Sequence, residues 1–187
     1  MASIDREVNL RSSISFSTWT SRIIKGLPNS GLSWRDSNEQ TYKEYVVSET
    51  NGNSITLKAD GPLICRGEIT LLDGDGNVLL EDSEAWLCRC GASKKMPFCD
   101  GSHKQADFHH AGEFEDARAE TLEDTSGPLQ ITVKPNAMLS FRGAVTIRSE
   151  DGRFQTQRSR GALCRCGQSQ KKPFCDASHK QCGFVAD

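Results

Sequence analysis

The feature that most constrains the fold of this chain is an internal repeat. Cys88 returns as Cys164 and His103 returns as His179, in each case 76 positions later. The match runs from residue 54 to residue 108, and about half of the aligned positions are identical, which is typical of a duplicated structural unit. Both copies are therefore expected to fold in the same way.

Each copy predicts three strands followed by a cysteine-rich loop. Segments 54–58 and 130–134 alternate apolar and polar residues, as half-buried strands do. Segments 65–72 and 141–147 form second strands, and turns rich in Gly and Asp then lead into a third strand in each copy. We predict a mainly β protein with short helices, in a small α+β arrangement.

The repeat divides the chain into four segments. Residues 1–53 have no counterpart and are expected to pack on the repeats in an unknown role, and residues 54–110 form the first unit. Residues 111–129 are an acidic linker, and residues 130–187 form the second unit.

Composition excludes several classes of protein. Apolar residues make up only 36% of the chain, and small units poor in apolar surface often depend on a metal. The formal charge of −2 argues against nucleic-acid binding. No apolar run reaches the roughly 18 residues that cross a bilayer, and Asp5 and Glu7 do not fit an export or transit signal. We expect a soluble cytoplasmic protein that binds neither nucleic acid nor membranes.

Six of the eight cysteines lie in two copies of the pattern C-x-C-x8-C-x3-H. Without an export signal a disulfide framework is disfavoured, and the two cysteines of C-x-C are too close for an ordinary disulfide. Metal ligation is the better interpretation. The candidate ligands are Cys88, Cys90, Cys99 and His103 in the first copy, and Cys164, Cys166, Cys175 and His179 in the second.

Two kinds of centre use such a ligand set, a tetrahedral zinc ion or a two-iron, two-sulfide cluster. Structural zinc sites commonly separate their first two ligands by two to four residues, whereas one residue separates them here. A cluster takes one adjacent pair of ligands per iron, and Cys99 and His103, four residues apart, share one face of a helical turn. The spacing favours the cluster and leaves zinc open.

Other positions in the motif have expected structural roles. Gly91 and Gly167 are expected to let the backbone pass close to the metal. Asp100 and Asp176 are expected to cap helices of about two turns, rather than to act as catalytic acids.

The string C-x-C-x2-S-x3-P-x-C-D-G-S-H resembles the signature of the CDGSH iron-sulfur proteins, the mitoNEET-like or NEET family. The second copy departs from it only at Ala177, where the signature has glycine. The first copy matches in full, through Cys88, Cys90, Ser93, Pro97, Cys99, Asp100, Gly101, Ser102 and His103.

This resemblance implies two [2Fe-2S] clusters, each held by three cysteines and one histidine. It assigns Cys88 and Cys90 to one iron and Cys99 and His103 to the other, and the second copy follows the same rule, with Cys164 and Cys166 on one iron and Cys175 and His179 on the other. Relatives with one motif form homodimers around a swapped β-sheet cap. The chain therefore resembles such a dimer fused into one polypeptide, a monomer whose units share a β-sandwich-like cap.

Two redox functions follow, and one alternative has no redox role. The protein either carries single electrons to a redox partner or donates its cluster, in a pH-sensitive manner, to an apo-protein. The alternative is a zinc-stabilised protein-interaction module. The sequence contains no catalytic set, so we do not expect an enzyme.

The remaining cysteines, two histidines and several basic residues have simpler interpretations. Cys65 is expected to be a buried apolar residue. Cys182 is expected to be a semi-exposed terminal thiol, with replacement of His179 in a damaged site as the alternative. His109 and His110 are interpreted as linker residues. Basic side chains around the first motif either favour an added electron or are simply solvated: Arg89, Lys94, Lys95 and Lys104.

Overall fold

The computed structural model describes residues 52–186. The predicted packing of the N-terminal segment 1–53 on the repeats lies outside the described residues, apart from Gly52 and Asn53, and stays a prediction.

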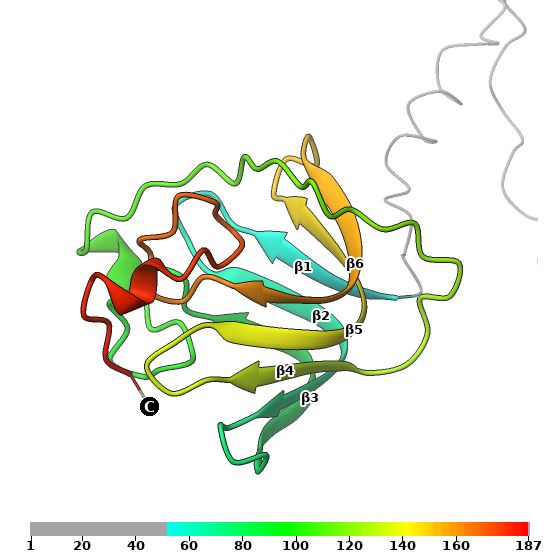
Figure 1. Ribbon diagram of the computed structural model, residues 1–187, viewed down its shortest axis with the longest axis horizontal. Coiled ribbons are helices and arrows are strands. Elements are labelled where there is room, and N and C mark those ends of the chain that lie inside the picture. Colours follow the sequence, from blue (N-terminus) through cyan, green and yellow to red (C-terminus); the bar gives the residue numbers. More distant parts are fainter. Residues whose placement is uncertain (1–51, 187) are drawn as a thin grey trace, which may run out of the picture. The chain divides into compact units, whose positions relative to one another are not determined.

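Each repeat contributes three strands and one short 3-10 helix (Figure 1). The first repeat contains β1 (Asn53–Leu57), β2 (Leu63–Leu72), β3 (Val78–Leu87) and η1 (Ser102–Lys104). The second contains β4 (Leu129–Val133), β5 (Leu139–Ser149), β6 (Gln155–Leu163) and η2 (Ser178–Lys180).

Four of the strands close into a ring. β1 pairs with β2 and β4 pairs with β5 in antiparallel fashion, while β2 pairs with β4 and β1 pairs with β5 in parallel. The third strand of each repeat is attached outside the ring, β3 to β2 and β6 to β5. The result is a small barrel-like sheet of six strands.

The ring joins the repeats reciprocally. Ile55 of β1 is opposite Ile147 of β5, and Ile131 of β4 is opposite Leu71 of β2. The two pairs are equivalent, because Ile131 lies 76 positions after Ile55 and Leu71 lies 76 positions before Ile147. The first strand of either repeat therefore pairs with the second strand of the other, and the two copies build one sheet together.

The inner faces of all six strands share one hydrophobic core. Ile55, Ile131, Leu139 and Ile147 are fully buried in it. Segment 54–58 was expected to be half-buried, but all five residues of β1 are buried, because β1 lies between two neighbouring strands in the closed ring. A single shared core makes good use of a limited supply of apolar residues.

The prediction of a mainly β protein is confirmed. The helices are shorter than the two turns expected, since η1 and η2 each span three residues. Within residues 52–186, no helix has the length and apolar character required to span a bilayer.

Candidate metal centre

Each motif forms a loop that backbone hydrogen bonds tie to the end of the third strand. In the first repeat the Cys88 N–H donates to the Pro97 carbonyl at 2.8 Å, and the Cys99 N–H donates to the Trp86 carbonyl at 2.9 Å. The second repeat forms the same two bonds, from Cys164 and from Cys175. This closure brings the C-x-C pair beside the third cysteine.

Polar side chains brace the loop from inside. The Ser93 hydroxyl donates to the Phe98 carbonyl at 2.6 Å, and Asp100 accepts backbone N–H groups from Lys94 and Ser102. Hydrogen bonds from the Ser102 hydroxyl and these N–H groups lower the pKa of Asp100 below its usual value. Ser169 and Asp176 form the equivalent bonds in the second repeat.

The prediction that Asp100 and Asp176 cap helices is therefore only partly confirmed. Asp100 does accept the N–H of Ser102 at the start of η1, but Gly101 is the residue at the cap position. The second oxygen of Asp100 holds the loop at Lys94, 2.8 Å away. Asp100 thus ties the two sides of the motif together.

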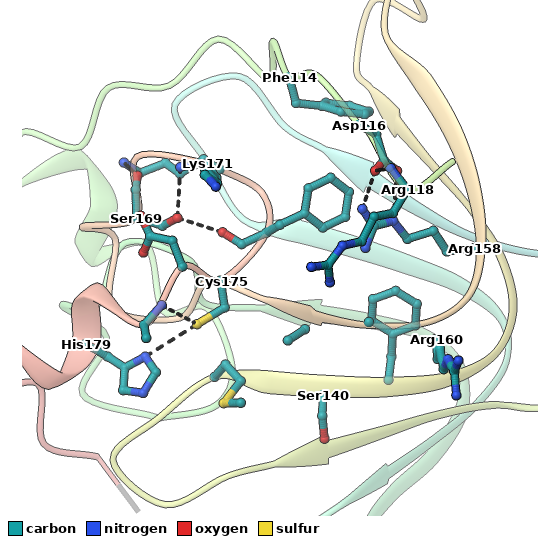
Figure 2. A pocket seen from close by; sticks show the side chains of 18 of the residues that line it. Phe114, Asp116, Arg118, Ser140, Arg158, Arg160, Ser169, Lys171, Cys175 and His179 are labelled. Atoms are coloured by element: carbon teal, nitrogen blue, oxygen red, sulfur yellow. Dashed lines mark hydrogen bonds and ion pairs between the residues drawn. The ribbon is translucent and has the colours of Figure 1, made fainter. Parts of the chain in front are cut away.

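The candidate ligands of each repeat lie in two pairs. The Sγ atoms of Cys88 and Cys90 are 3.6 Å apart, and Cys99 Sγ is 3.4 Å from His103 Nδ1. In the second repeat the separations are 3.7 Å for the two sulfurs of Cys164 and Cys166 and 3.4 Å for Cys175 Sγ and His179 Nδ1. Figure 2 shows Cys175 and His179 pointing toward each other.

These separations fit two ligands on one tetrahedral metal. With metal–sulfur bonds of about 2.3 Å and metal–nitrogen bonds of about 2.0 Å, tetrahedral angles separate two sulfurs by about 3.8 Å and a sulfur and a nitrogen by about 3.5 Å. Within residues 52–186, however, no three or more Cys, His, Asp or Glu side chains form a group that could hold a single metal ion. The donors are arranged two by two.

Burial acts against the charged form of most of these thiols. It raises the pKa values of Cys99, Cys166 and Cys175. In the first C-x-C pair, a hydrogen bond from Cys90 lowers the pKa of Cys88 to about 6, while the same bond raises the pKa of Cys90. A bound metal supplies the positive charge that keeps such thiols deprotonated.

The arginine between the two cysteines of each C-x-C is buried. Arg89 is 3% exposed and Arg165 is 1% exposed, and their guanidinium carbons lie 5.2 Å and 5.1 Å from the ring centroids of Phe108 and Phe184. Burial lowers the pKa of Arg89 to about 10, which leaves the side chain charged at neutral pH. Four basic residues surround the first motif in the sequence. Among them Arg89 is buried, whereas Lys94, Lys95 and Lys104 are exposed.

His110 is more than a linker residue. Arg89 Nη1 lies 2.8 Å from His110 Nδ1, and Arg89 Nη2 donates to the His110 carbonyl. Burial and then the charge of Arg89 lower the pKa of His110 to about 4, so the ring is neutral. The sequence could not indicate this contact, because Ala186 occupies the equivalent position and supplies only its carbonyl to Arg165. His109 is exposed, as expected of a linker residue.

The two motifs touch through their glycines. Gly91 has φ +81° and Gly167 has φ +78°. A Cβ on Gly91 would overlap the Cys166 carbonyl, and a Cβ on Gly167 would overlap the Cys90 carbonyl. Glycine is therefore required at both positions by the close approach of the two repeats. The expected approach of this backbone to a metal stays a prediction.

The second motif and its surroundings differ from the first in burial, in backbone chemistry and in a neighbouring thiol. His179 is 7% exposed, whereas His103 is half-buried. Ala177 adopts φ +71° where Gly101 has φ +88°, so an alanine occupies the left-handed region. Cys182 is exposed, and its thiol donates a hydrogen bond to the His179 carbonyl at 3.7 Å.

The acidic linker packs against β6, and this packing was not predicted from the sequence. Its part 113–122, called the strap below, lies along β6, where the Glu120 N–H donates to the Gln157 carbonyl at 2.9 Å. Asp116 accepts bonds from both Thr156 and Arg158, a nearly buried ion pair. Burial acts to raise the pKa of Asp116, but these bonds outweigh it and hold the pKa at about 2.

The strap also reaches the second motif (Figure 2). The Phe114 ring packs edge-on against Phe174 with 6.0 Å between centroids, and the Arg158 guanidinium lies 3.9 Å above the Phe174 ring. Phe174 directly precedes the candidate ligand Cys175. The linker is thus a packed part of the second repeat.

Cys65, the remaining cysteine, lies in the hydrophobic core as expected. It is fully buried, and burial raises its thiol pKa to about 12.

Comparison with known families gives one result that covers both repeats. A family model described as an iron-binding zinc finger of the CDGSH type matches residues 60–104 and 126–180. A comparison with curated proteins found no match.

Proposed function

Because the chain belongs to the family of CDGSH-type iron-binding domains, we propose that each repeat holds one [2Fe-2S] cluster and that the protein carries single electrons. Cys88 and Cys90 would hold one iron of the first cluster, and Cys99 and His103 the other. Cys164 and Cys166 would form one pair in the second repeat, and Cys175 and His179 the other.

The observation that carries this proposal is the pairwise arrangement of the donors. Separations of 3.4–3.7 Å within each pair suit two ligands on one tetrahedral metal. A zinc site requires all four donors around one point, and no such group of three or more lies within the described residues. Two pairs per repeat support two irons per repeat.

A bound [2Fe-2S] cluster accepts and releases one electron at a time. Three thiolates and one neutral imidazole leave the site one unit less negative than four thiolates would. The buried charge of Arg89, and of Arg165 in the second repeat, adds to this effect. Plant-type ferredoxins, whose ligands are all cysteines, have reduction potentials of about −400 mV. We therefore expect higher reduction potentials for both clusters of this protein.

Reciprocal pairing of the strands supports the further proposal that the chain is the equivalent of a fused homodimer. β1 pairs with β5 and β4 pairs with β2 in matching registers. One polypeptide would then present two centres about a pseudo-two-fold axis, without a second chain.

Cluster transfer to an apo-protein is a second candidate, favoured by the partial exposure of His103. An imidazole must be unprotonated to bind a metal, so protons compete for its nitrogen as the pH falls. Protons reach a half-buried ring more readily than a buried one. Incubation with an apo-ferredoxin separates the two candidates, because an electron carrier keeps its iron.

The experiment that tests the main proposal is an iron and acid-labile sulfide assay on protein purified without oxygen. We expect about four of each per chain and a visible absorption band. His103→Cys should retain the band and lower the potential of the first centre, by about 100 mV or more, because a thiolate adds negative charge. His109→Gln, at an exposed histidine of the same repeat, should change neither.

One or two zinc ions in a colourless protein would contradict the proposal, since the filled d shell of zinc has no visible band. Disulfide-linked ligand cysteines would contradict it as well.

A further inference from the structure

A groove of about 1780 Å³ lies beside the second motif (Figure 2). Residues of β4, β5, β6, the second motif loop and the strap line it, and Cys175 and His179 are among them. The candidate ligands Cys175 and His179 therefore border a large concave surface.

The walls of this groove are strongly cationic. Apart from the strap, its lining contains seven Lys or Arg side chains and a single carboxylate, that of Asp176. Asp176 already accepts the backbone N–H groups of Gln170 and Ser178. A wall with this composition concentrates positive potential in a chain whose formal charge is −2.

Among the described residues, most of these cations form no ion pair. Arg158 is paired with Asp116, and Lys172 Nζ donates to the Ser169 carbonyl. Within residues 52–186, none of the ion pairs involves Arg142, Arg160 or Lys171, and all three side chains are exposed. Their charges are available to a ligand.

The first repeat has no equivalent of this surface. Arg158 and Arg160 of β6 correspond to Asp82 and Glu84 of β3. Arg66, the counterpart of Arg142, is already paired with Glu84 at 2.6 Å. The cationic wall is therefore a property of the second repeat and not of the shared fold.

The strap shows what kind of molecule fits. It is an extended acidic segment, and it binds β6 through carboxylates and backbone together, with Asp116 on Arg158 and Glu120 on the Ser159 N–H. Among the wall cations of the described residues, only Arg158 forms an ion pair with the strap. Hydrogen bonds from Ser159, and then the charge of Arg160, lower the pKa of Glu120.

We propose that this groove is the docking surface for an acidic, extended segment of a partner protein, which it holds beside Cys175 and His179. The purpose of such docking, transfer of an electron or of a cluster, rests on the proposed function. The binding of the acidic segment does not rest on it. The strap is itself an acidic polypeptide segment, and it binds β6 through carboxylates and a backbone hydrogen bond together, so an acidic polypeptide is favoured over a nucleic acid as the occupant.

The test measures binding of a fluorescein-labelled acidic peptide to the full chain by anisotropy. The probe is a peptide of about twelve alternating Glu and Ser residues, and its Gln-for-Glu counterpart is the charge control. We expect binding that weakens as NaCl rises from about 50 to about 500 mM, since salt screens exposed charges. The Gln peptide should not bind.

Matched variants locate the binding. Arg142→Gln with Lys171→Gln removes two exposed charges from the groove and should weaken peptide binding about tenfold. Arg66→Gln with Lys95→Gln removes the equivalent charges from the first repeat and should leave binding within about twofold. Iron and sulfide contents of both variants are measured on the same samples.

Equal losses in the two double variants, or no binding to the unsubstituted protein, would overturn the proposal. So would binding of an oligothymidylate as tight as that of the peptide, competition by inorganic pyrophosphate at equal concentration, or concentration-dependent dimerisation that Arg142→Gln with Lys171→Gln abolishes. If the chain binds the peptide as expected but contains zinc instead of iron, the proposed function is wrong and the docking surface stands.

Discussion

The third strands of the two repeats occupy equivalent positions in the sheet but have opposite chemistry. β3 presents the exposed carboxylates Glu81, Asp82 and Glu84, whereas β6 carries the buried Arg158 and the exposed Arg160. The strap covers the edge of β6, and exposed Val78 and Trp86 remain on β3. Because β3 pairs with β2 in nearly the same register as β6 pairs with β5, the duplicated fold tolerates very different side chains on its surface.

The motifs themselves show the contrary pattern. Cys88 and Cys164 make the same backbone bond to the proline of their loop, and the cysteine–histidine pairs are separated by the same 3.4 Å. Nearly identical loops are thus set in different surroundings. Substitutions at equivalent positions of the two repeats measure how far the repeats are equivalent.

The largest effect is expected at the glycines where the motifs touch. Gly91→Ala and Gly167→Ala should each destabilise the protein by about 2–5 kcal/mol, because the new methyl group overlaps a carbonyl and φ is positive. Urea unfolding measures both. Gly101→Ala, where no atom lies within 4 Å of the added Cβ, is the control and should cost about 1 kcal/mol.

Equal costs at Gly91 and Gly167 would support a reciprocal contact. A tolerated alanine at either position would mean that the two motifs do not touch there.

The second effect concerns the strap. Asp116→Asn should cost about 2–3 kcal/mol, because Arg158 is only 8% exposed and loses its anionic partner. Glu84→Gln, which breaks the exposed pair with Arg66 on the first repeat, should change stability little.

The contribution of Asp116 should also depend on pH. Its folded pKa of about 2 lies below its ordinary value of 3.8, so the stabilisation is fully present above pH 4 and is lost as the pH falls toward 2. The difference between the protein and Asp116→Asn should shrink over that range. A difference that is constant with pH would exclude the ion pair as its source.

The third effect distinguishes the two histidines. At pH about 5.5 the first centre should lose its visible absorbance severalfold faster than the second, since His103 is half-buried and His179 is buried. Variants with a single intact centre, made by Cys99→Ser or Cys175→Ser, resolve the two rates. Equal rates in both variants would show that burial of the histidine does not control proton access.

The smallest effect is expected at the one departure from the motif. Ala177→Gly should stabilise the protein by up to about 1 kcal/mol, because glycine adopts a φ near +71° without the steric penalty of alanine. Thermal unfolding of this variant beside Gly101→Ala compares the two repeats directly. Destabilisation by Ala177→Gly would show that the methyl group makes favourable contacts.

Much of the site could be predicted because its parts are close in sequence. Cys99 and His103 are four residues apart, so local backbone alone brings their side chains together. The C-x-C pairs meet for the same reason. The role of Arg89 was harder to predict, because its partners include Lys58 and His110, which the fold brings from both sides.

The strap could not be predicted at all from local pattern. Asp116 and Arg158 are 42 positions apart, and a run of acidic residues is usually solvated. The contact between Gly91 and Cys166 is equally invisible, since it joins two loops 75 positions apart. A glycine required by a metal and a glycine required by a neighbouring loop look identical in a sequence.

The duplication, the strand content and the grouping of donors within each motif could be predicted from the sequence, because hydrophobic alternation and short spacings act through local geometry. The exchange of strand partners, the contact between the motif loops and the packing of the linker beside the second motif were found only in the folded structure. Those outcomes depend on which surfaces meet when one core is closed, and contacts between distant residues leave no local signal.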